Sequence, residues 1–169
     1  MQLQEIDKTT YRKHLNRLIV ALILFLALFS LGISQLMIHL FTDGVGSHFK
    51  LNLLGTGITT ALIVWLLNRY RNHPAMHEIV YVWDLKQELN RIYRKLKKVK
   101  AGVEAGERDA MIILNFSYRG SRQLYTLDDN TITIDELNQQ LQALEKTIED
   151  HGYDISVEDY RPELLQKYK

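Results

Sequence analysis

The most prominent feature of the hydrophobic pattern is a pair of long apolar stretches near the start of the chain. Leu18 to Phe41 contains 24 consecutive residues without Asp, Glu, Lys or Arg, and Leu51 to Leu67 contains 17. A helix rises about 1.5 Å per residue, so these stretches would measure roughly 36 Å and 25 Å, against roughly 30 Å for the hydrocarbon core of a bilayer. We therefore predict two membrane spans, at about 18–41 and 51–68, joined by a short loop.

Two other interpretations of the first stretch are weaker. A secretory signal peptide would also start with basic residues, but its apolar core is about 7 to 15 residues long and ends at a small-residue cleavage site. Here the apolar residues continue beyond Ser30, Gly32 and Ser34. A soluble core helix does not explain the second uncharged stretch, so a helical hairpin in a membrane is favoured.

The distribution of Lys and Arg predicts how the hairpin is oriented. The first seventeen residues contain four of them and the loop contains one, Lys50, while Arg69 and Arg71 follow the second span. Because Lys and Arg are enriched on the cytoplasmic flanks of spans, both termini are expected in the cytoplasm. We predict a multi-pass membrane protein, with a two-span hairpin over residues 1–72 and a cytoplasmic helical domain over residues 73–169.

The second half of the chain has helical periodicity throughout. Pro74 predicts a break or kink after the second span, with Asn72 or His73 as the cap. Apolar residues then recur at alternating spacings of three and four, which is typical of a long amphipathic helix. This heptad stripe consists of Val82, Leu85, Leu89, Ile92, Leu96 and Val99, followed by Val103. A second line, Ile79, Trp83 and Tyr93, is expected to widen the buried face.

Two further long helices and one short one follow. The long helix is expected to end near 101–106, where two Ala-Gly pairs occur, and a second helical pattern covers 107–127. Thr133 and Glu136 fit a capping box that starts the third helix, and Gly152 is a plausible stop. Its apolar stripe is Leu137, Leu141, Leu144 and Ile148, and a short helix should follow Pro162. The predicted fold class is all-α: a transmembrane hairpin followed by a small cytoplasmic helical bundle.

Several apolar patterns allow either packing within one chain or association between copies. The heptad stripe could pack on the later helices or specify a homo-oligomer. In the second span, Gly55 with Thr59 and Gly57 with Ala61 are small residues four apart, which permit close approach of helices. They could pack on the first span or on a neighbouring hairpin. Gln35 and His39 lie one turn apart near the outer end of the first span and are expected to cap the hairpin, although a conducting path is an alternative.

Charge is unevenly divided along the chain. The net charge is +1 overall. Residues 1–100 hold 14 basic and 6 acidic residues, a difference of +8, whereas residues 101–169 hold 7 and 14, a difference of −7. The candidate contacts to anionic lipid are Arg91, Arg94, Lys95, Lys97 and Lys98. Alternatively these cations pair with acidic residues of the third helix, Asp135, Glu136, Glu145 and Glu149. Because no nucleic-acid module is present, nucleic acid is not an expected partner.

The sequence contains no catalytic signature. It has no Gly-rich phosphate loop and no nucleophile elbow, and its histidines do not match a specific metal motif. The absence of cysteine excludes disulfides and thiolate metal sites. The segment from Asp128 resembles a calcium loop only superficially, because Thr133 stands where Gly is needed. We therefore expect a protein that is not an enzyme and needs no cofactor or metal.

Three strings carry a family resemblance over essentially the full length: NLLGTGI, YVWDLKQELNRIYRKLKKVK and ILNFSYRGSRQLYTLDDNT. The chain resembles a family of uncharacterised two-span inner-membrane proteins of gamma-proteobacteria that contain a domain of unknown function. The resemblance implies a bacterial inner membrane and supplies no activity or ligand. The expected partners are the lipid bilayer, a second copy of the chain, and a membrane or cytoplasmic protein. The expected function is presentation of the cytoplasmic domain for self-association or partner binding; the alternative is an oligomeric pore built from hairpins.

Overall fold

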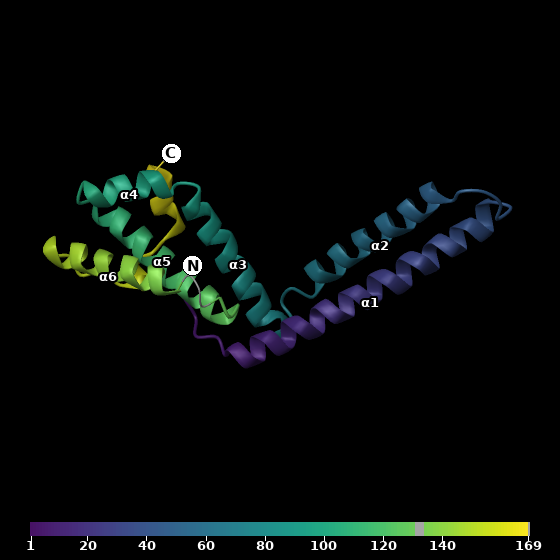
Figure 1. Ribbon diagram of the computed structural model, residues 1–169, viewed down its shortest axis with the longest axis horizontal. Coiled ribbons are helices and arrows are strands. Elements are labelled where there is room, and N and C mark those ends of the chain that lie inside the picture. Colours follow the sequence, from purple (N-terminus) through teal and green to yellow (C-terminus); the bar gives the residue numbers. More distant parts are fainter. Residues whose placement is uncertain (131–133, 169) are drawn as a thin grey trace. The chain divides into compact units, whose positions relative to one another are not determined.

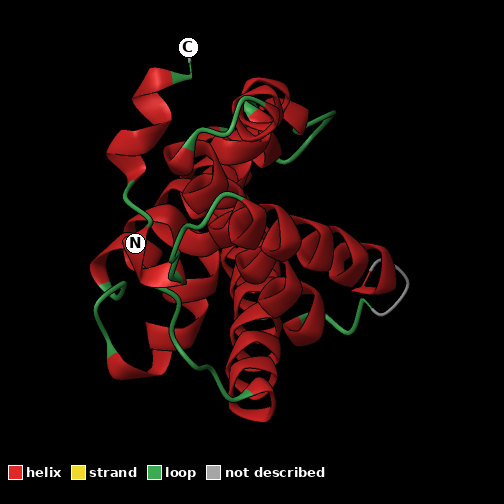
Figure 2. Cartoon of the chain, turned by 90° about the vertical axis from the view of Figure 1, so that its left-hand side faces the viewer, coloured by secondary structure: helices red, strands yellow, loops and turns green. Residues whose placement is uncertain are grey.

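The computed structural model describes residues 1–130 and 134–168, and within them the chain forms helices and loops without strands, as Figure 2 shows. The all-α fold class is confirmed. The chain divides into two compact units: residues 9–79 form one, and residues 1–8 together with 80–169 form the other. The N-terminal segment therefore belongs with the helical bundle, whereas the sequence pattern grouped it with the hairpin.

The unit of residues 9–79 is an antiparallel pair of apolar helices. The helix α1 (Lys8–Phe41) and the helix α2 (Phe49–Arg69) are joined by a loop that contains two glycines with positive φ, Gly44 and Gly46 (Figure 1). Both helices are long and apolar enough to cross a membrane. The hydroxyls of Thr56, Thr59 and Thr60 donate to backbone carbonyls one turn earlier, at 2.9–3.0 Å. These polar groups of α2 are thus satisfied inside their own helix.

The two small-residue pairs of α2 lie on opposite sides of the helix. Gly55 and Thr59 are buried, and a Cβ added at Gly55 would lie 3.0 Å from the Ser34 backbone nitrogen and 3.2 Å from the Ser30 carbonyl oxygen. Gly55 is therefore a point of close approach between α1 and α2. Gly57 and Ala61 are exposed, and no atom lies within 4 Å of a Cβ placed at Gly57.

The predicted break at Pro74 is confirmed. A short 3₁₀ helix, η1 (Pro74–Met76), separates α2 from α3 (His77–Tyr93). His73 caps η1, because its Nδ1 accepts a hydrogen bond from the Ala75 N–H at 3.2 Å. At the start of α3, Glu78 pairs with His14 of α1 at 3.2 Å, and this contact lies within the hairpin unit.

The long amphipathic helix predicted from the heptad stripe is divided in two. The helix α3 ends at Tyr93, and α4 (Leu96–Glu104) follows after a tight turn in which the Lys95 N–H bonds the carbonyl of Ile92 at 2.9 Å. Figure 1 shows that α4 runs in a different direction from α3. The apolar spacing of three and four continues through the turn, so periodicity alone could not reveal it.

The core of the bundle is formed around α5 (Arg108–Leu127). All seven residues from Ala110 to Phe116 are buried, including Asn115, so this part of the helix has no solvent-facing side. The helices α4 and α6 (Ile134–Asp150) and the 3₁₀ helices η2 (Val157–Asp159) and η3 (Pro162–Lys167) contact it. A helix that is apolar all round must be enclosed by other elements, and here the C-terminal segment completes the enclosure.

Helix ends in the bundle follow the predicted glycines. Gly106, with φ +77°, ends α4, and Gly152, with φ +68°, ends α6. In each case the next residue donates its N–H to a carbonyl five residues back, Glu107 to Gly102 at 2.9 Å and Tyr153 to Ile148 at 3.1 Å, which is a Schellman motif. The four predicted apolar residues of α6 are buried. The capping box predicted with Thr133 involves a position outside the described residues.

The N-terminal segment is fastened to the bundle by polar contacts. The Tyr81 hydroxyl of α3 accepts from the Gln4 N–H at 2.9 Å and donates to the Gln123 side-chain oxygen of α5 at 2.8 Å. The Gln123 amide in turn donates to the Gln4 carbonyl at 2.5 Å. An ion pair between Lys8 and Asp129 adds to this cluster. The start of the chain is therefore bound to two helices that lie more than 70 residues later.

We predict that Gly55→Leu separates α1 from α2, because the new side chain would collide with the Ser34 backbone. Since the chain has no cysteine, spin labels can be attached uniquely at the exposed positions Leu24 and Val64. In detergent micelles, the mean distance between the two spin labels should increase and its distribution should broaden. Gly57→Leu is the matched control and should leave it unchanged; equal effects of both substitutions would contradict this packing.

Candidate functional site

An exposed basic surface covers the end of α3 and the outer side of α4. Arg91, Arg94, Lys97 and Lys98 are exposed, and so is Lys100. Lys95 differs, because its ammonium group donates to the Leu165 carbonyl at 2.8 Å and holds the C-terminal segment. Of the five predicted lipid-contacting residues, four therefore share the surface and the fifth is turned toward the bundle.

The alternative pairing of this surface with α6 does not occur in the described residues. Arg91 lies 3.1 Å from Glu88 of its own helix. Glu145 of α6 pairs with Arg119 of α5 at 2.7 Å, and Arg119 also bonds the buried Asn115 at 2.9 Å. No ion pair within the described ranges joins 94–100 to Asp135, Glu136 or Glu149. The positive charge of α4 is thus left facing solvent.

Two aromatic side chains lie on the solvent side of α3. Trp83 is 61% exposed and Tyr93 is 73% exposed. The prediction that they widen the buried face is wrong. Their spacing from the heptad residues places Trp83 and Tyr93 beside the buried stripe, but it does not show whether another helix covers them. The other helices pack around α5, so this side of α3 stays exposed. Exposed Trp and Tyr next to cations are characteristic of surfaces at a membrane interface.

The predicted heptad interface is occupied within the chain. Val82, Leu85, Leu89, Ile92 and Val99 are buried, and Leu96 is half-buried. Gly120 of α5 allows α3 to approach, since a Cβ there would lie 3.3 Å from side-chain carbons of Leu85 and Leu89. Contact between copies through this stripe would require the bundle to open. Among the predicted span-packing residues, only Gly55 and Thr59 face α1.

A buried carboxylate lies between α3 and the C-terminal segment. Glu88 is 5% exposed and accepts a hydrogen bond of 2.5 Å from the Tyr160 hydroxyl, while the Tyr160 ring stacks on Phe116 with 4.0 Å between ring centroids. Burial raises the pKa of Tyr160, and the neighbouring Glu88 carboxylate raises it further, so the hydroxyl remains a donor at neutral pH. Sequence reasoning missed this pair. Glu88 is three residues after Leu85 and four before Ile92, which was the available signal for its burial.

A groove of about 230 Å³ lies between α4, α5 and α6. Val103, Leu114 and Leu144 give it an apolar wall, and Lys100 and Glu104 lie at its rim. Its remaining lining residues are Tyr118, Gln140, Ala143 and Thr147. Burial raises the pKa of Tyr118, and its hydroxyl has no hydrogen bond within the described residues. This groove can hold an apolar group together with one hydrogen-bond acceptor.

The geometry offers no metal centre in the part of the chain that the structure describes, where no three His, Asp or Glu side chains converge. His39, considered for conduction, is exposed on α1, and Gln35 is exposed as well. The candidate functional features are therefore surfaces: the exposed basic and aromatic face of α3 and α4, and the groove between α4, α5 and α6.

Comparison with known proteins gives a family and no activity. Residues 1–165 match the family described as protein of unknown function (DUF3087), and the chain belongs to that family. No curated protein and no solved structure matches the chain.

We predict that Tyr160→Phe lowers the free energy of unfolding by about 2 kcal/mol, because the buried Glu88 carboxylate loses one of its two donors and keeps only Arg91. Urea unfolding of the full chain in detergent, followed by near-ultraviolet circular dichroism, measures this. The control is Tyr153→Phe, whose hydroxyl makes a longer bond of 3.2 Å to the Gly106 carbonyl. E88L/Y160F should be more stable than Y160F, since no incompletely hydrogen-bonded carboxylate stays buried and Arg91, which loses its partner, is exposed to water. A Y160F variant as stable as the wild type would refute the assignment.

Proposed function

We propose that this member of the DUF3087 family is an integral protein of the bacterial inner membrane. It crosses the membrane twice, keeps both termini in the cytoplasm, and presents its helical bundle as a non-enzymatic platform for a protein partner or a second copy of itself.

The observation that carries this proposal is the exposed apolar surface of α1 and α2. In the most apolar part of each helix only 6% and 11% of the residues are buried inside the chain. Large apolar side chains such as Ile23, Leu28, Leu31, Leu53 and Val64 face outward. Leaving one such side chain in water instead of burying it costs about 1.5–3 kcal/mol. A hydrocarbon environment removes this cost, whereas a soluble core helix would have been covered by the chain itself.

The N-terminal contacts support an even number of crossings. Gln4 precedes the first apolar helix, and its partners Tyr81 and Gln123 follow the second. Direct hydrogen bonds between these residues require that the start of the chain and the bundle lie on the same side of the membrane. Two spans satisfy that requirement, and one span would not.

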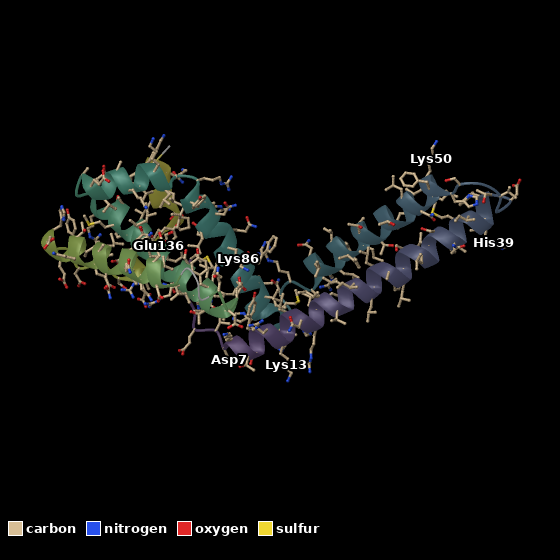
Figure 3. All side chains as sticks on the ribbon, viewed as in Figure 1. Asp7, Lys13, His39, Lys50, Lys86 and Glu136 are labelled. Carbon is tan, nitrogen blue, oxygen red and sulfur yellow. The ribbon has the colours of Figure 1, made fainter. Side chains whose placement is uncertain are left out.

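The charges at the two ends of the hairpin support a cytoplasmic bundle. Figure 3 shows Lys13 at one end of α1, with His39 and Lys50 at the other end beside the loop. Lys8, Arg12, Lys13 and Arg17 give the first end four basic residues, whereas Lys50 is the single Lys or Arg of the loop segment 42–50. By the positive-inside rule the loop faces the periplasm.

The groove supports partner binding. It joins apolar residues of three helices with an unused Tyr118 hydroxyl and has opposite charges, Lys100 and Glu104, at its rim. Apolar grooves with a few polar groups are typical sites for an anchoring side chain of another protein.

Membrane topology follows as a direct test. We expect Val45→Cys, in the loop, to react with a membrane-impermeant maleimide in intact spheroplasts. Gln2→Cys and Glu158→Cys, both at exposed positions, should react only after the membrane is opened. The protein should also resist extraction by alkaline carbonate. Labelling of Glu158→Cys in intact spheroplasts would place the bundle outside and refute the proposed topology.

Native mass spectrometry of protein extracted gently from its own membrane tests the groove. We expect a complex with a second protein or copy, and Ala143→Trp should abolish it by filling the groove. Gln142→Trp is the matched control, because Gln142 is exposed on the same helix and does not line the groove. A strictly monomeric wild-type protein, or equal loss of the complex with both variants, would contradict the platform.

An oligomeric pore is the alternative function, and the open face at Gly57 and Ala61 favours it. That face is free of contacts from α1, and small residues four apart allow another hairpin to pack closely. A pore would be favoured if the protein forms a defined homo-oligomer of four or more copies. Gly57→Leu should then dissociate this oligomer, and Ala143→Trp should leave it intact. Ion flux through proteoliposomes would then be the decisive measurement.

A further inference from the structure

We propose that the exposed basic and aromatic face of α3 and α4 binds the anionic phospholipid headgroups of the membrane in which the protein is anchored. This inference rests on the proposed insertion of the hairpin and adds a second, reversible contact between the bundle and the lipid. It assigns a ligand class to residues that the rest of the fold leaves unused.

The first argument is an excess of positive charge that the protein does not neutralise. Residues 89–103 contain six basic residues and no acidic one. Lys97, Lys98 and Lys100 make no ion pair or hydrogen bond within the described residues. Arg94 reaches only the Asn90 carbonyl of its own helix, at 3.5 Å.

Several cations elsewhere in the bundle are paired. Lys86 pairs with Asp128 at 2.9 Å, Arg119 with Glu145 at 2.7 Å, and Arg108 with Asp159 at 3.6 Å. Their acidic partners, Asp128, Glu145 and Asp159, lie at the end of α5, in α6 and in the C-terminal segment. The unpaired cations of α4 form a local surface whose natural complement is a dense array of negative charge.

The second argument is the pair of exposed aromatic side chains. At 100° per residue, Trp83 and Arg94 point in nearly the same direction from the helical path, and Tyr93 lies about 80° away. Trp83, Tyr93 and Arg94 therefore lie on one exposed side of α3, and the exposed cations of α4 follow directly along the chain. Indole and phenol rings favour the headgroup region of a bilayer, where their apolar part is covered and their polar group stays hydrated.

The third argument is the length of chain between the membrane and this face. Only seven residues separate the end of α2 at Arg69 from the start of α3 at His77. Extended residues span at most about 3.6 Å each, and the 17-residue helix α3 spans about 25 Å. The covalent chain therefore keeps Tyr93 within roughly 50 Å of the end of the second span. Lipid is the anionic partner that is always present at that distance, which favours it over nucleic acid.

The test uses Trp83 as an intrinsic probe in the full-length chain. Trp65 is the other tryptophan, and it lies in α2, so a Trp65→Phe background leaves Trp83 as the single emitter. The protein is reconstituted into vesicles of phosphatidylcholine, or of two parts phosphatidylcholine to one part phosphatidylglycerol, each with brominated lipid as the quencher. We expect the Trp83 emission to shift to shorter wavelength and to be quenched only in the anionic vesicles. High salt should reverse both changes.

Substitution of the basic residues should release Trp83 from the lipid, as high salt is expected to do. In R94Q/K97Q/K98Q the ratio of docked to free bundle in anionic vesicles should fall about fivefold per cation, and therefore about a hundredfold in total. The matched control, R122Q/K146Q/R161Q, removes three exposed basic residues elsewhere on the bundle and should retain docking.

Three results would overturn the proposal. The first two are equal quenching of Trp83 in neutral and anionic vesicles, and an equal loss of docking in both triple variants. The third is release of Trp83 from anionic vesicles by a single-stranded oligonucleotide whose concentration is lower than that of the accessible phosphatidylglycerol. Co-flotation with the vesicles after carbonate treatment is measured in every sample. A protein that stays integrated while Trp83 remains unquenched refutes lipid docking alone, whereas loss of integration refutes the proposed membrane function.

Discussion

Enclosure of α5 is the constraint from which the organisation of the bundle follows. Its segment Ala110 to Phe116 has no polar side to turn toward water, so every direction around it must be covered. The helices α3, α4 and α6 cannot do this alone, and the C-terminal segment completes the cover with Tyr160 stacked on Phe116. The cost of this arrangement is the buried Glu88 carboxylate, which the Tyr160 hydroxyl and Arg91 offset.

The same requirement, removal of apolar side chains from water, has a different solution in the hairpin. There the helices touch closely at Gly55 and Ser34, and most of their apolar surface remains outside the chain. In the proposed membrane location, lipid would supply the cover that protein supplies in the bundle, and the threonine hydroxyls of α2, which bond their own helix, would need no partner from it. The two units thus differ in what surrounds their apolar residues, while the principle that orders them is shared.

Much of the fold could be predicted because its signals are local. The two uncharged stretches, the break at Pro74, the stripe from Leu137 to Ile148 and the stop at Gly152 depend on length, spacing and backbone freedom. Features that depend on tertiary packing could not be predicted. The turn at Arg94 and Lys95 preserves the apolar spacing, Trp83 lies at the edge of the stripe, and Glu88 finds a partner 72 residues away. Likewise, the sequence could not show that Gly55, and not Gly57, contacts α1, because this depends on where α1 lies beside α2.

The surfaces left over by this packing are what the protein can offer to other molecules. Glu145 pairs with Arg119 of α5, and Lys97, Lys98 and Lys100 on α4 have no acidic partner within the described residues. A stretch of unpaired like charges destabilises a compact domain through self-repulsion unless a counter-charge is nearby. Under the proposed anchoring, an anionic leaflet would supply that counter-charge at little further cost in translational freedom, because the chain is already held at the membrane. The groove shares Lys100 with the basic surface, whereas Arg94, Lys97 and Lys98 do not line it, so the two proposed binding surfaces overlap at Lys100.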